Sequence, residues 1–185
     1  MTLREKAVTA TFWSGADILL RQTIHFVIAI ILARLLAPEE FGTIALLYLF
    51  VGLASAFVDC GLASALIQRQ DVTHTDETTV FWFNVVMGGI MALGLFAISP
   101  WIASFFNLPI LIPLTGLLAL NLFIGALGAI QSTLLTKRLD FKMQMKISAT
   151  ATFISGTIAV WMAWRGLGVW TLALQTLIAT SITTA

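Results

Sequence analysis

The first long apolar stretch of the chain carries charged residues near its middle, and this combination restricts the possible folds most strongly. Residues Thr9–Ala37 are apolar over a length that can cross a bilayer, yet Asp17, Arg21 and His25 recur within them at every fourth position. On a helix this spacing places the three side chains in one polar stripe. Because a charge at membrane depth is costly, such a stripe is expected to face a bundle interior or a water-filled cavity.

The composition agrees with a membrane protein. Charged residues make up 10% of the 185 residues and hydrophobic residues 59%, whereas a soluble domain carries about 25% charged residues. The single cysteine, Cys60, excludes an internal disulfide and a cysteine-rich metal site. The net charge of +1 does not indicate a protein that binds a polyanion such as a nucleic acid. We expect no nucleic acid, metal ion or cofactor.

The length of the apolar stretches predicts an all-α, polytopic membrane helix bundle. A membrane-spanning helix needs about 20 mainly apolar residues, which gives about six spans. Short turns between spans one and two, three and four, and five and six predict three helical hairpins, and the third span is long enough to tilt or to kink near Pro100. The predicted spans cover residues 9–36, 41–67, 79–106, 109–136, 147–164 and 167–185.

The distribution of basic residues predicts the orientation. Basic loops stay on the cytoplasmic side of a membrane, and the turns expected on the other side hold only Arg34 and Arg165. We therefore expect both termini to be cytoplasmic. The last stretch is still apolar at Ala185, and we expect the chain to be part of a longer protein. The N-terminal tail and the two longer loops hold Arg4, Lys6, Arg69, Lys137, Arg138, Lys142 and Lys146.

Three stretches of the chain resemble one family of bacterial membrane proteins. They read LARLLAPEEFG at Leu32–Gly42, DCGLASALIQRQ at Asp59–Gln70 and GVWTLALQ at Gly168–Gln175, with FWFN at Phe81–Asn84. Together they resemble the polysaccharide transporter family, which comprises inner-membrane exporters and flippases of lipid-linked oligosaccharides. Its superfamily includes multidrug and toxin extrusion antiporters and lipid II flippases.

The resemblance implies an architecture, a location and a partner. It implies that these residues form the N-terminal lobe of a two-lobed exporter fold. The C-terminal lobe, which these residues do not include, would be its partner. The location would be the bacterial cytoplasmic membrane, and the substrate a polyprenyl-pyrophosphate-linked oligosaccharide. With only one wall of the central cavity, a single lobe is not expected to transport substrate alone.

The residues of the first span are candidates for a polar cavity wall. Arg21 would meet the pyrophosphate of a lipid carrier, because a guanidinium pairs bidentately with phosphate. Asp17 would orient Arg21 or take part in proton or cation coupling. Alternatively, Asp17 and Arg21 only neutralise each other, and His25 bonds to a neighbour. We prefer the cavity interpretation because even paired charge is expensive in lipid.

Asp59 and Asn84 complete the candidate cavity residues. Asp59 is predicted at the same depth as Asp17, so it either pairs with Arg21 or clamps a helix end. Asn84, like Asn121 and Gln131, is a neutral amide in an apolar span. Such amides join membrane helices by hydrogen bonds, and we favour that role over substrate contact for all three.

The loop between the fourth and fifth spans is basic. Its basic residues would attract anionic membrane lipids or a carrier phosphate. We prefer the alternative, that they are an ordinary topology signal. These residues are Lys137, Arg138, Lys142 and Lys146. His74, Asp76 and Glu77 are weak evidence for a metal site, since acids also suit the positive end of a helix dipole.

The competing functions are few. The sequence contains no HExxH, GxSxG or paired histidines, so an enzyme is not expected. We expect a flippase for cell-surface polysaccharide biosynthesis. A multidrug or cation antiporter of the same superfamily and a non-transporting membrane interaction subunit are the alternatives.

Overall fold

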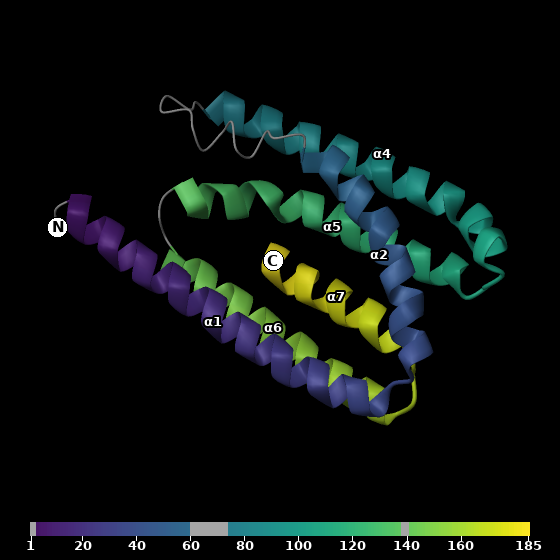
Figure 1. The fold of residues 1–185 in the computed structure, drawn as a ribbon. Helices are drawn as coiled ribbons and strands as arrows, with labels where there is room; N and C mark the ends of the chain where they lie inside the picture. The colour runs from purple at the N-terminus through teal and green to yellow at the C-terminus, as the bar shows by residue number, and fades with distance from the viewer. Residues whose placement is uncertain (1–2, 60–73, 138–140) are drawn as a thin grey trace.

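The computed structural model describes residues 3–59, 74–137 and 141–185, and these ranges are helical and contain no strand. This confirms the predicted all-α bundle. The helices are α1 (Leu3–Leu35), α2 (Pro38–Asp59), α4 (His74–Phe106), α5 (Leu111–Lys137), α6 (Phe141–Trp164) and α7 (Val169–Thr184). In Figure 1 α1 runs beside α6 and α4 beside α5, with α7 between these two pairs and α2 crossing the bundle.

Five of these helices, α1, α2, α4, α5 and α6, are long and apolar enough to cross a membrane. The sixth predicted span is present as α7, whose 16 described residues are apolar but fewer than the ~20 that a span needs. The third predicted span stays helical through Pro100. The chain is therefore a multi-pass membrane protein, as its composition indicated.

Two of the three predicted hairpins form, and the first does not. Helices α4 and α5 pack together, as do α6 and α7, but α1 packs mainly on α6 and not on α2. Figure 1 shows α2 diverging from α1 toward α4, α5 and α7. The reason is local: Ile28 and Leu32 of α1 are buried, and Ile28 lies against Gly156, where α6 has no side chain.

Two of the short turns close with left-handed residues. Asn107 ends α4 with φ 53°, and Leu108 donates its N–H to the Ala103 carbonyl at 3.0 Å. Gly166 ends α6 with φ 76°, and Leu167 donates to the Met162 carbonyl at 3.2 Å. Both are Schellman-type C-caps, in which a left-handed residue lets the chain reverse while pairing the last carbonyls.

Helix α5 forms the centre of the bundle. It contacts α4, α7, α2 and α6, and its Leu111, Leu114 and Leu118 are fully buried. Large apolar side chains point outward instead on α4 and α6, with Phe105 and Trp164 about 80% exposed. Apolar surface on this scale suits lipid as the solvent. Lipid thus accounts for the exposed apolar side chains, but it does not account for polar side chains inside the bundle.

Candidate functional site

One cavity lies between the second half of α2, the first half of α4, the middle of α5 and the last turns of α7, and we call it the mid-helix cavity. Its volume is about 280 Å³. The walls combine small apolar residues with two amides and two hydroxyls, and none of the described lining residues is charged. The lining residues are Val51, Ser55, Val58, Asn84, Asn121, Leu122, Gly125, Ala126, Ala129 and Thr180.

Close contact between α4 and α5 brings the two amides to this cavity. Gly88 packs so tightly against Ala126 that a Cβ at Gly88 would collide with the alanine side chain. Asn84 lies one turn before Gly88 on α4 and is 6% exposed. The amide oxygens of Asn84 and Asn121 are both buried and have no hydrogen-bond partner. Each leaves an acceptor unpaired inside an apolar bundle, where such a group is costly.

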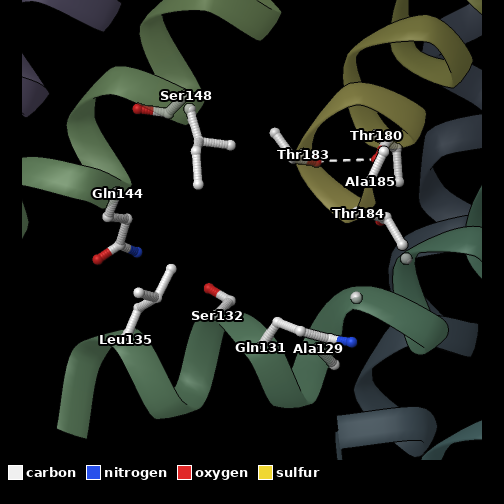
Figure 2. A pocket seen from close by; sticks show the side chains of 13 residues that line it. Ala129, Gln131, Ser132, Leu135, Gln144, Ser148, Thr180, Thr183, Thr184 and Ala185 are labelled. Atoms are coloured by element: carbon white, nitrogen blue, oxygen red, sulfur yellow. Dashed lines mark hydrogen bonds between the residues drawn. The ribbon is translucent and has the colours of Figure 1, made fainter. Parts of the chain in front are cut away.

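A second cavity, the end cavity, opens between the ends of α5, α6 and α7 with a volume of about 560 Å³. In Figure 2 Ser132 and Leu135 of α5 and Gln144 and Ser148 of α6 border the opening, with the last residues of α7 on the other side. Hydroxyl and amide groups again supply the polarity, and no charged residue is among the described ones that line it.

The two cavities meet at a shared wall. Gly125, Ala129 and Thr180 line both of them. The end of α7 is held to α5 there, because the Thr184 hydroxyl donates a hydrogen bond to the Ile124 carbonyl at 3.3 Å. The two cavities therefore adjoin each other, and together we call them the polar track; none of its described lining residues is charged.

Of the predicted cavity residues whose side chains the structure describes, Asn84 lines this track and His25 does not. Asp17 and Arg21 lie on α1 and Asp59 ends α2, but their side chains are outside the described part of the structure. His25 is exposed on α1, and neither cavity has a described wall residue on that helix. The roles of Asp17, Arg21, His25 and Asp59 remain predictions.

The structure shows how the three amides lie, and their preferred role as links between helices stays a prediction. Asn84 and Asn121 make no bond between helices through their amide oxygens. Gln131, with its amide turned so that the nitrogen faces acceptors, donates to the Leu127 and Gly128 carbonyls of its own helix at 2.9 and 3.2 Å. Asn121 is thus a cavity residue that the sequence alone assigned to helix association.

Neither of the basic residues whose side chains the structure describes in this region, Lys137 and Lys146, lines the two cavities. Lys137 is half-buried in the last turn of α5, and Lys146 is exposed on α6. Arg138 and the side chain of Lys142 fall outside the described residues, as do Cys60 and the side chains of His74 and Glu77. Within the described residues, no cluster of His, Cys, Asp or Glu is of a size to hold a metal ion.

The fold and the cavities together define a class: a polytopic α-helical membrane protein with uncharged polar space inside its bundle. Comparison with known families makes this specific. Residues 31–185 match the family described as polysaccharide biosynthesis protein, and the chain belongs to that family.

Curated relatives carry names from the same field. The chain is 29% identical to the lipopolysaccharide biosynthesis protein WzxC of Escherichia coli over 86% of its residues. It is 31% identical over 94% of its residues to the succinoglycan biosynthesis transport protein ExoT of Rhizobium meliloti. It is also 32% identical over 58% of its residues to the teichuronic acid biosynthesis protein TuaB of Bacillus subtilis.

The matched region is a part of each relative. It covers 32% of WzxC, 35% of ExoT and 22% of TuaB, so the chain spans about a third or less of their length. No solved structure matches the chain.

Proposed function

We propose that this chain forms one wall of a flippase that moves lipid-linked oligosaccharide or polysaccharide across the bacterial cytoplasmic membrane for cell-surface polysaccharide biosynthesis. The chain binds and guides its substrate and performs no chemistry on it. Its N-terminus is cytoplasmic, so the end cavity opens toward the side on which lipid-linked precursors are assembled.

The observation that carries this proposal is the uncharged polar track through an apolar bundle. A lipid-linked glycan has an apolar tail that lipid can solvate and a hydroxyl-rich head that lipid cannot. The exposed apolar faces of α1, α4 and α6 suit the tail, and the two cavities offer the head hydroxyl and amide groups. The names of two relatives, the lipopolysaccharide biosynthesis protein WzxC and the succinoglycan biosynthesis transport protein ExoT, support a role in polysaccharide transport.

A second wall completes the passage. The polar track lies along one side of the helices that form it and is open, and the chain matches about a third of WzxC and ExoT. We therefore propose a facing C-terminal lobe, supplied by the same protein, as the structural partner. Membrane lipids surround the assembly.

Reconstitution tests the function directly. The complete gene product is placed in liposomes that hold a fluorescent polyprenyl-pyrophosphate oligosaccharide in both leaflets, and a membrane-impermeant quencher reports the fraction that changes leaflet. We expect saturable flipping of this lipid and no efflux of an organic cation such as ethidium. Cation efflux without lipid flipping would make the protein a multidrug antiporter. If the folded protein shows neither activity, the remaining interpretation is a non-transporting membrane interaction subunit.

A further inference from the structure

The amide oxygens of Asn84 and Asn121 point to the chemistry of a ligand. Asn84 is 6% exposed, both oxygens are buried, and neither accepts a hydrogen bond. They come from two different helices, α4 and α5, and line the same cavity. Two unpaired acceptors at one cavity call for a ligand that brings hydrogen-bond donors.

The rest of the wall points the same way. The Ser55 hydroxyl donates its proton to the Gly52 carbonyl of its own helix at 2.8 Å, which leaves only its lone pairs for a ligand. Among the described residues that line the mid-helix cavity there is no Lys, Arg or His. Along this described wall a phosphate would find no cationic side chain, whereas a neutral ring with several hydroxyl donors would find acceptors on α2, α4 and α5.

Access and size fit one sugar of a longer chain. The mid-helix cavity, at about 280 Å³, is near the lower end of small-molecule pockets. At Gly125, Ala129 and Thr180 it adjoins the end cavity of about 560 Å³. The larger space can hold further sugars of the same chain while one ring occupies the smaller.

We infer that the mid-helix cavity is a glycan subsite, in which Asn84 and Asn121 accept hydrogen bonds from the hydroxyls of one sugar of the lipid-linked substrate. The subsite recognises the sugar and not the pyrophosphate. This inference rests on the proposed flippase function and adds to it a location and a part of the substrate.

The test separates the sugar from its carrier. The complete gene product in nanodiscs is titrated with a polyprenyl-pyrophosphate oligosaccharide and, separately, with the same polyprenyl pyrophosphate without sugar. For Asn84→Leu and Asn121→Leu we expect at least a tenfold loss of affinity for the glycosylated lipid. Affinity for the bare lipid should stay within twofold of the unsubstituted protein.

Thermal unfolding of the ligand-free protein guards against a purely structural effect. Leucine has the branched shape of asparagine but is larger, and the adjoining cavity of about 280 Å³ leaves room for the added volume. Leucine also removes the unpaired acceptor, so Tm should stay the same or rise. Thr115→Val is the matched control on α5, because its hydroxyl is buried but already donates to the Leu111 carbonyl at 2.6 Å. It should leave both affinities unchanged.

The remaining outcomes overturn the inference in distinguishable ways. Equal losses for both lipids, or a lowered Tm in both leucine variants, would make Asn84 and Asn121 structural. A Tm rise on adding NaCl that both leucine variants abolish would make the cavity a cation site. If the unsubstituted protein binds neither lipid, the proposed function itself fails, and the glycan subsite fails with it.

Discussion

The carboxylate of Glu40 lies directly against Gly168, at a point where a Cβ on the glycine would collide with it. The same carboxylate accepts a hydrogen bond from the backbone N–H of Ala37 at 2.8 Å, which caps the start of α2. Two stretches that carry the family resemblance, around Pro38 and around Gly168, therefore touch in space. Their contact joins the turn before α2 to the turn before α7.

Replacement of Gly168 by alanine should destabilise the bundle. Gly168 has φ 58°, a left-handed conformation that costs other residues about 1–3 kcal/mol, and the new methyl would displace Glu40. Gly166→Ala is the control, because Gly166 has φ 76° but no neighbouring atom within 4 Å of a Cβ. In detergent, the free energy of unfolding should fall more for Gly168→Ala, and equal losses would exclude the Glu40 contact as a cause.

A serine beside the proline of α4 should be needed for stability. Pro100 has no N–H to donate to the Phe96 carbonyl, and the Ser99 hydroxyl, which is 1% exposed, donates to that carbonyl at 2.7 Å. Ser99→Ala should cost about 1–3 kcal/mol by leaving the carbonyl unpaired. Adding Pro100→Ala restores a backbone donor, so the double variant should recover most of the loss. No recovery would show that the serine acts otherwise.

Adjacent glycines on α4 should respond oppositely to alanine. Gly→Ala within a helix gains roughly 0.5–1 kcal/mol from backbone entropy. At Gly89 the new Cβ would lie 3.7 Å from the Phe123 ring, an ordinary contact, so Gly89→Ala should stabilise the protein or leave it unchanged. At Gly88 the Cβ would collide with Ala126, so Gly88→Ala should lose roughly 1–3 kcal/mol. Thermal unfolding of both variants measures the contrast.

The predicted orientation can be read by cysteine labelling. With Cys60 replaced by serine, single cysteines at Glu39 and Lys146 would lie on opposite sides of the membrane. Both positions are exposed. An impermeant maleimide added to intact cells should label the cysteine at 39 and spare the one at 146, which should react only after permeabilisation. The reverse pattern would invert the topology.

Arg21 is predicted to serve transport and not insertion. An arginine at mid-membrane costs roughly 2.5–3.5 kcal/mol on insertion scales, so Arg21→Ala in the complete gene product should insert normally but lose polysaccharide export. Arg21→Lys keeps the charge without the bidentate fork and should retain partial export. If Arg21 only neutralises Asp17, the combination of Asp17→Asn with Arg21→Gln should export fully, which would exclude Arg21 from the substrate path.

The sequence predicts the helices well because each is a long apolar run, and its turns because Asn107 and Gly166 can adopt left-handed conformations. It predicts the α4–α5 and α6–α7 pairs from their short turns but not the partner of α1. The adjacency of α1 and α2 in the chain favoured a hairpin, but partner choice depends on local shape, such as the gap at Gly156 that admits Ile28.

The cavity shows a similar limit. Asn84 was recognisable as a polar residue in an apolar span, and so was Asn121, but residue type alone could not separate an amide that bridges two helices from one that faces a cavity. That distinction depends on the close approach of α4 and α5 at Gly88, which only the assembled bundle reveals.

The pairing of α1 with α6 has a consequence for biosynthesis. Phe141, the first residue of α6, leaves the ribosome more than a hundred residues after α1 ends at Leu35, which takes roughly 5–20 s at about 5–20 residues per second. Throughout this interval α1, with Asp17 and Arg21 on it, has no permanent helix beside it. The most polar helix of the bundle must therefore be sheltered by the insertion machinery or a transient neighbour until α6 arrives.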